Sequence, residues 1–162
     1  MAGERIAAIA AHPRFREQYA LLWAAERERE FCGHDMAHLL DVARLMYIYA
    51  LEDGAALSRE LIYAAALLHD IGRYAQCSAG TPHHIAGAAL AGEILESCGF
   101  SPEETGRVQR AIAAHREAPG TEDDALSAYL YRADKASRRC WDCPAAAACN
   151  WPKEKRNKTV GY

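Results

Sequence analysis

An adjacent histidine and aspartate, His69 and Asp70, follow the apolar segment 64–68. Two ionisable groups at the end of an apolar helix are costly to bury unless they are paired, hydrogen-bonded or bound to a metal. One interpretation of the pair alone is a capped helix end closed by a hydrogen bond between the two side chains. His38 and Asp134 favour the metal, because each shares a predicted helix face with apolar residues.

These residues supply a mixed nitrogen and oxygen ligand set from separate helices. His38 lies on one stripe with Val42, and Asp134 lies beside Ala133. Imidazole nitrogens and carboxylate oxygens that converge inside a helical bundle are suited to a divalent transition metal. We therefore predict a metal site formed by His38, His69, Asp70 and Asp134.

The order of these residues resembles that of the HD superfamily of metal-dependent phosphohydrolases, in which a histidine, an adjacent His-Asp pair and a distant aspartate lie on helices. The resemblance covers roughly residues 30 to 140, and its matching segments are His38-Leu39-Leu40-Asp41-Val42-Ala43, Leu68-His69-Asp70-Ile71-Gly72 and Tyr131-Arg132-Ala133-Asp134-Lys135. His34 lies one helical turn before His38 and could share its metal. The family spacing favours His38, and we expect His34 to be solvated or to support a ligand.

Two further segments resemble the part of this superfamily that binds two metals: His83-His84-Ile85-Ala86-Gly87-Ala88 and Ala111-Ile112-Ala113-Ala114-His115-Arg116. The resemblance implies a second ion held by His83, with His84 as the alternative, and by His115, and it implies that Asp70 bridges both ions. In the other interpretation no second metal binds: His83 and His84 form a polar helix start, and His115 is a donor that faces the substrate. The Gly-Tyr-Pro motif of cyclic-dinucleotide phosphodiesterases is absent after His115, which disfavours that substrate.

The resemblance implies a phosphomonoesterase or phosphodiesterase acting on a nucleotide or another small phosphorylated metabolite. Its cofactor would be one or two divalent ions of Mn, Fe, Ni, Co or Zn, which lower the pKa of bound water. We expect Asp70, Arg73 and Lys135 to act in catalysis. Arg73, Arg116, Lys135 and Arg138 are candidates for binding the substrate phosphate, with a solvated surface role as the alternative for each. A di-iron oxygenase and a noncatalytic nucleotide or redox sensor are the alternative functions.

Three cysteines, Cys140, Cys143 and Cys149, follow the Asp134 helix with two-residue and five-residue gaps. This pattern indicates a zinc or iron–sulfur site, since thiolates two residues apart can reach one ion. A fourth ligand is not evident, and Cys32 or Cys77 could serve only if the fold brings it near. The alternative is a tail whose cysteines and tryptophans pack on the bundle. The tail resembles the cysteine-bearing tails of uncharacterised bacterial HD proteins, a resemblance that implies no activity.

Helical spacing of apolar residues and abundant alanine predict an all-α fold, an HD-type bundle of about six helices with an irregular C-terminal tail. Ser58, Thr81, Ser101 and Thr121 are predicted N-caps, and Ser101 with Glu104 forms a capping box. The expected helices cover residues 13–30, 35–51, 59–72, 82–98, 102–115 and 122–138. We expect one helical domain, 1–139, with the tail 140–162 packed on it.

Composition limits the function classes. The chain has 162 residues, of which 51% are apolar, and this is enough for one domain. A net charge of −3 gives no strong nucleic-acid signal, and apolar runs are too short for a membrane span. We expect a cytoplasmic protein with reduced cysteines and a small phosphorylated partner. The sequence leaves the oligomeric state undetermined.

Overall fold

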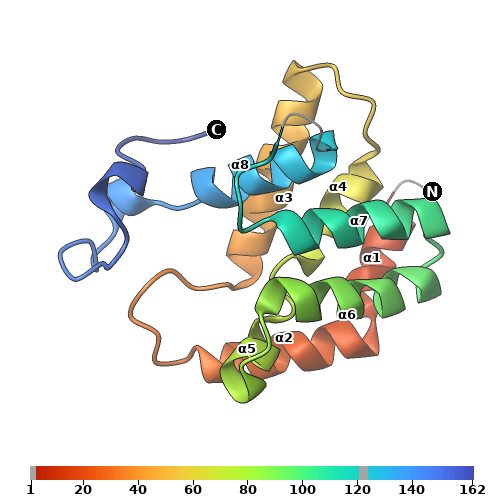
Figure 1. The fold of residues 1–162 in the computed structure, drawn as a ribbon, viewed down its shortest axis with the longest axis horizontal. Coiled ribbons are helices and arrows are strands. Elements are labelled where there is room, and N and C mark those ends of the chain that lie inside the picture. The colour runs from red at the N-terminus through yellow and green to blue at the C-terminus, as the bar shows by residue number, and fades with distance from the viewer. Residues whose placement is uncertain (1–2, 121–123) are drawn as a thin grey trace.

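The structure, a computed structural model, describes residues 3–120 and 124–162 (Figure 1). No strand occurs in these two ranges, so the predicted all-α fold is confirmed. The helices are α1 (Glu4–Ala11), α2 (Pro13–Ala25), α3 (Met36–Glu52), α4 (Arg59–Leu68), α5 (Arg73–Ala79), α6 (His83–Ser97), α7 (Pro102–Ala114) and α8 (Ala125–Ala136), with short 3-10 helices at Cys140–Asp142 and Lys153–Lys155.

Several helix starts follow directly from capping side chains. The Ser58 hydroxyl accepts the Leu61 amide at 3.1 Å and begins α4, as predicted. Ser101 and Glu104 form the predicted capping box at the start of α7. Asp124 caps α8 through the Leu126 amide, whereas the predicted start at Thr121 and Glu122 lies outside the described residues.

Other predicted boundaries differ from those of the structure. The first predicted helix ends at Ala25, because the Glu26 side chain binds the backbone and ring of His34. Thr81 does not cap α6, whose N-cap is Pro82 without a side-chain bond. The predicted helix over 59–72 ends at Leu68. Two short helices, α1 and α5, were missed by the prediction.

The centre of the core is α4, which is buried at every position from Leu61 to Leu68 except Tyr63. Its alanines let α3, α6, α7 and α8 pack closely around it. In Figure 1, α6 and α7 lie side by side in front of α4. The end of α4 therefore delivers His69 and Asp70 into the interior of the bundle rather than to its surface.

The C-terminal tail projects from one end of the bundle beyond α8 (Figure 1). Asn157 attaches it there, because its Nδ2 donates to the carbonyl oxygens of Lys135 at 2.8 Å and Arg138 at 2.7 Å. Arg156 donates to the carbonyls of Ala146, Cys149 and Trp151 and holds the tail in a closed loop. The tail is thus attached to the end of α8 that carries Asp134.

None of the described helices is long and apolar enough to span a membrane.

Candidate metal centre

Four side chains from three elements meet at the end of α4. His38 comes from the first turns of α3, His69 and Asp70 follow α4, and Asp134 lies near the end of α8. One ligand atom from each lies within 4.8 Å of the others. His69 Nε2 is 3.0 Å from Asp70 Oδ2, and His38 Nε2 is 3.4 Å from Asp134 Oδ1. The structure therefore brings together the four residues predicted to bind the first metal.

The atoms that face one another in this group lack hydrogen bonds. His38 Nε2, His69 Nε2, Asp70 Oδ2 and Asp134 Oδ1 are all buried and have no hydrogen-bond partner within the described residues. Buried polar atoms without partners are costly in a folded protein. A cation between them would satisfy all four atoms at once, so the donor set fits a divalent metal.

A second group lies on the other side of Asp70. His83 from the start of α6 and His115 at the end of α7 have Nε2 atoms 3.2 Å apart. Asp70 Oδ1 is 3.7 Å from His83 Nε2 and 3.8 Å from His115 Nε2. Asp70 thus offers Oδ2 to the first group and Oδ1 to the second, the arrangement expected of a bridging carboxylate.

The opposite ring nitrogen of each histidine is held by an acceptor. Donation from Nδ1 turns Nε2 toward the ligand group, so that Nε2 can bind a metal once it carries no proton. The partners are the Ala66 carbonyl for His69 at 2.7 Å, the Ile112 carbonyl for His115 at 2.6 Å, Gln76 Oε1 for His83 at 2.7 Å and the Ser137 hydroxyl for His38 at 3.3 Å. The rings are therefore oriented before any ion binds.

Gly72 allows the two groups to lie side by side. A Cβ at this position would be 2.2 Å from the His83 carbonyl oxygen and 2.4 Å from the Gly87 amide nitrogen. The φ of Gly72 is −81°, so close approach of the α6 backbone, rather than an unusual dihedral angle, requires the glycine. The turn after Asp70 therefore packs directly on the helix that supplies His83.

Burial and charge set the protonation of the two groups differently. Burial would lower the pKa of His69, but Asp70 and Asp134 outweigh it and raise this pKa to about 10. Burial opposes ionisation of both carboxyls, yet the neighbouring histidines hold their pKa values well below the usual range. Burial lowers the pKa of His83 to about 3 and that of His115 to about 4. The second pair is therefore neutral at pH 7, the form that binds metals.

Cationic side chains contact the carboxylates from the edge of the site. Arg73 Nε donates to Asp70 Oδ1 at 2.8 Å, and Lys135 Nζ lies 2.6 Å from Asp134 Oδ2. Arg138 Nη2 is 3.6 Å from Asp134 Oδ1. Three of the four predicted phosphate-binding residues thus adjoin the candidate metal ligands. The fourth, Arg116, is exposed and lines a separate hollow.

His84 also lines that hollow beside Arg116, and it belongs to neither ligand group. Between the two neighbouring histidines, the geometry therefore selects His83.

Three residues support the ligands, and only His34 was predicted among them, as a residue that is solvated or supports a ligand. His34 is buried, not solvated, and its Nε2 is 4.0 Å from Asp70 Oδ2. Its Nδ1 pairs with Glu26 Oε1 at 2.7 Å. Gln76 accepts both the backbone N–H and the ring Nδ1–H of His83. Only the spacing of His34 before His38 gave a signal in the sequence, since Glu26 and Gln76 lie in segments without a recognisable motif.

The tail cysteines belong to neither group of ligand atoms, although His38 lines the same cavity as they do. Cys140, Cys143 and Cys149 line a cavity together with Cys32, whereas Cys77 is exposed on α5. Of the two residues considered as a fourth ligand, the fold thus brings Cys32 to the tail and leaves Cys77 away from the cavity.

Comparison with known proteins gives three matches. The HD domain family model matches residues 36–139. An uncharacterized protein of Clostridium beijerinckii is 38% identical over 137 residues, which are 85% of each chain. The crystal structure of a predicted HD superfamily hydrolase from an uncultured Thermotogales bacterium has a TM-score of 0.63 and 25% identity, and the match covers 89% of this chain and 82% of that one.

Proposed function

This chain belongs to the HD domain family, and from that premise we propose that it is a metal-dependent phosphohydrolase acting on a nucleotide or another small phosphorylated metabolite. The similarity to a predicted HD superfamily hydrolase and the His/Asp cluster support a metal-dependent hydrolase in general. The observation that carries the proposal is the position of Asp70, whose two oxygens each face a separate group of metal-ligand atoms.

The ligand sets divide into two sites that share Asp70. His38, His69 and Asp134 would complete the first site, and His83 and His115 would complete the second. When bound, divalent ions of Mn, Fe, Ni, Co or Zn supply Lewis acidity and a water of lowered pKa. Asp70 is the residue best placed to hold and orient the attacking water, because it lies between the two groups.

Arg73 and Lys135 are proposed to bind the phosphate. Both adjoin the ligand carboxylates, and their side chains are 21% and 32% exposed, so a substrate can reach them from solvent. Arg73 contacts Asp70 through Nε, which leaves its two Nη nitrogens for a bidentate bond with phosphate. Lys135 would add a mobile positive charge beside the same phosphate. Arg138 is more deeply buried, which favours support of Asp134 over substrate contact.

A cytosolic location is also proposed. All six cysteines are free thiols, although the chain contains enough of them for three disulfides. Free thiols are typical of a reducing compartment.

Hydrolysis assays with defined metals test the proposal. The purified chain, loaded separately with manganese, iron, cobalt, nickel or zinc, would be incubated with nitrophenyl phosphate mono- and diesters and with nucleoside monophosphates. We expect metal-dependent release of phosphate or nitrophenol, a loss of at least about 100-fold in Asp70→Asn, and no loss in the exposed control Asp41→Asn. Equal activity in the two variants would contradict the proposal.

The same samples separate the two alternative functions. Oxygen uptake by the iron-loaded chain without phosphate release would instead support an oxygenase. Metal binding without turnover of any of these substrates would support a sensor.

A further inference from the structure

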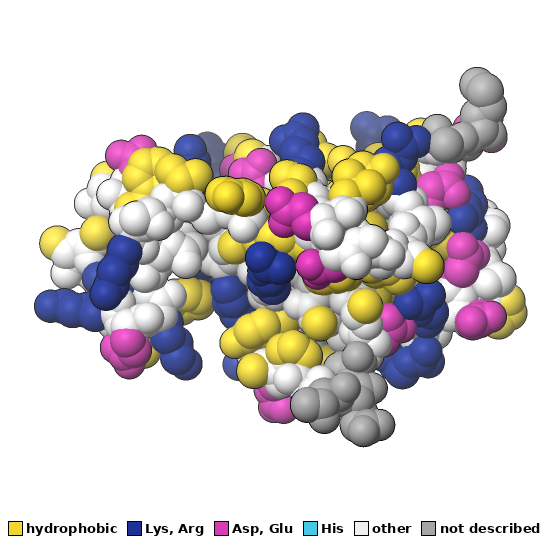
Figure 2. Space-filling view, turned by 90° about the horizontal axis from the view of Figure 1, so that it is seen from above, with side chains coloured by type: hydrophobic (Ala, Val, Ile, Leu, Met, Phe, Trp, Pro, Cys, Tyr) yellow, Lys and Arg dark blue, Asp and Glu magenta, His cyan; other side chains and the backbone are white. Residues whose placement is uncertain are grey.

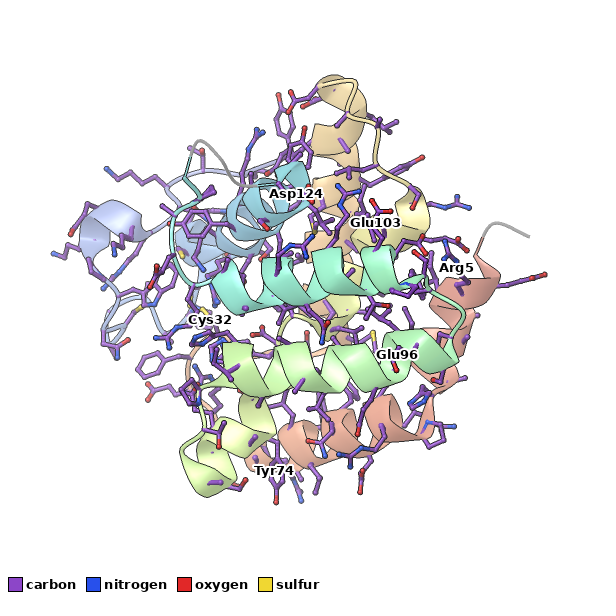
Figure 3. All side chains as sticks on the ribbon, turned by 45° about the vertical axis from the view of Figure 1, so that its right-hand side comes forward. Arg5, Cys32, Tyr74, Glu96, Glu103 and Asp124 are labelled. Atoms are coloured by element: carbon purple, nitrogen blue, oxygen red, sulfur yellow. The ribbon has the colours of Figure 1, made fainter. Side chains whose placement is uncertain are left out.

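Four of the six cysteines surround one cavity. Cys32 comes from the loop between α2 and α3, while Cys140, Cys143 and Cys149 come from the C-terminal tail. The cavity has a volume of about 310 Å³. Figure 3 shows the labelled Cys32 beside the tail, at the end of the bundle where α8 finishes. Residues more than a hundred positions apart in the sequence are therefore gathered at one place.

The remaining two cysteines do not share this position. Cys77 lies on α5 and Cys98 follows α6, and neither lines the cavity. Cysteines that served only as small apolar core residues would be buried, yet the four around the cavity are all partly exposed at its walls. Their convergence is thus unlike ordinary core packing and is typical of a thiolate ligand set.

The spacing of the sulfur atoms bears on whether the cysteines bind a single zinc ion or an iron–sulfur cluster. Zinc bonds to sulfur are about 2.3 Å long, so tetrahedral ligation puts the sulfurs about 3.8 Å apart. No three thiol sulfurs in the described part of the chain lie within 4.8 Å of one another. A four-iron cluster holds its thiolates further apart because the cluster itself stands between them. The sulfurs are therefore not gathered for a single zinc ion, whereas the cavity of about 310 Å³ that the four cysteines line has room for a four-iron cluster.

Donors suited to an anionic group face this cavity. The Arg138 side chain is only 9% exposed, and its Nε is buried without a hydrogen-bond partner in the described ranges. The backbone N–H of Trp151 donates to Cys149 Sγ at 3.4 Å, a contact of the kind that tunes cluster thiolates. Arg139 and Arg156 also line the cavity. Three acidic residues at its wall, Asp35, Asp41 and Asp142, are exposed to solvent.

Basic side chains also mark the outside of this region. The left-hand end of the molecule in Figure 2, where the tail lies, carries several lysine and arginine side chains, and this face shows no histidine. The positive charge of the tail is compatible with a cluster that, with its four thiolates, carries about two negative charges.

From these observations we infer that Cys32, Cys140, Cys143 and Cys149 bind a [4Fe–4S] cluster in this cavity. Binding of a preformed cluster forms four iron–sulfur bonds and releases four thiol protons to solvent, with no change in the oxidation state of the iron. Cys32 is the ligand that the tail alone does not supply. The cluster would join the loop before α3 to the end of α8.

The proposed cluster site lies next to the metal centre. His38 and Ser137 line the same cavity, and Arg138 connects the Cys32 side of the cavity with Asp134. The cluster would therefore fix the segments that carry two ligands of the first metal. The inference does not depend on the proposed phosphohydrolase activity, because its ligands and its test are separate.

Anaerobic reconstitution with equal amounts of ferrous and ferric iron, and with sulfide, tests the inference, because two ferrous and two ferric ions with four sulfides form the cluster without a further oxidant. Acid-labile sulfide and visible absorption near 400 nm are the readouts, because iron bound at the histidine sites contributes to neither. We expect about four sulfides per wild-type chain, at least a fivefold loss in Cys32→Ser, and no loss in the matched control Cys77→Ser. Circular dichroism confirms that each variant is folded.

A second measurement uses only the wild-type chain. After reconstitution, alkylation followed by mass spectrometry should label the exposed Cys77 but not Cys32, whereas both should be labelled before reconstitution. Three results would overturn the inference: zinc bound by the cysteines without sulfide, equal sulfide in Cys32→Ser and Cys77→Ser, or labelling of Cys32 in the reconstituted chain.

Discussion

Replacing Gly72 by alanine is expected to damage the fold and the second metal site together. The new Cβ would lie 2.2 Å from the His83 carbonyl oxygen and 2.4 Å from the Gly87 nitrogen. These are backbone atoms and cannot rotate away, so α6 must move by about 1 Å to restore ordinary contact. Overpacking of this kind costs about 3 kcal/mol in the free energy of unfolding.

The same movement would separate His83 from Asp70, whose nearest ligand atoms are 3.7 Å apart in the native fold. Metal ligation tolerates errors of only about 0.2 Å in distance. We therefore expect Gly72→Ala to weaken binding of the second ion at least tenfold while the first ion, held through α3 and α8, is less affected. Urea unfolding and metal titration followed by calorimetry would measure the two effects.

Gly33→Ala is the matched control, because a Cβ there would meet no atom within 4 Å. It should change the free energy of unfolding by less than about 0.5 kcal/mol. If Gly72→Ala is as stable as this control and still binds two ions equally well, then the packing of α6 on the turn after Asp70 does not position His83 as described.

Two further perturbations test the supports of the site and of the fold. Gln76→Leu removes the acceptor of the His83 ring and should lower the affinity for the second metal about 10-fold to 100-fold in calorimetric titration. An unchanged affinity would show that Gln76 does not fix the tautomer of His83. Arg5→Ala removes the partner of Glu60 and Glu104, whose hydrogen bonds to Arg5 lower the pKa of both carboxyls below 4.5. Because these partly exposed pairs contribute about 1 kcal/mol at most, the variant should be less stable by that amount at pH 7, and the difference should shrink as the pH falls below about 4.5. A constant difference down to pH 2 in urea unfolding would contradict this origin.

The parts of the fold that depend on local chemistry were predictable from the sequence. The capping box of Ser101 and Glu104 uses side chains three residues apart, so its signal is contained in a short segment. The His69-Asp70 pair after an apolar helix is equally local. The choice of His38 over His34 depended on family spacing, and the structure places His38 among the ligand atoms.

Features that depend on distant residues were not predictable. Glu26 ends α2 and binds His34 because the following loop folds back, which no periodicity reveals. A glycine at the end of a helical pattern usually indicates that the helix stops, yet α5 begins directly after Gly72. This glycine is required by the close packing of the turn on α6, which the sequence does not reveal. Cys32 joins the tail cysteines only through the arrangement of α3 and α8. Tertiary contacts decided each of these cases.

The number of metal ions per chain tests the central claim most directly. Manganese-loaded chains, prepared without sulfide and freed of unbound metal, would be analysed for metal content as wild type, Asp70→Ala, His115→Ala and the exposed control Asp41→Ala. The shared position of Asp70 predicts about two ions in wild type and in the control, about one in His115→Ala and none in Asp70→Ala. Full metal content in folded Asp70→Ala, or no metal in wild type, would contradict a metal centre built around Asp70.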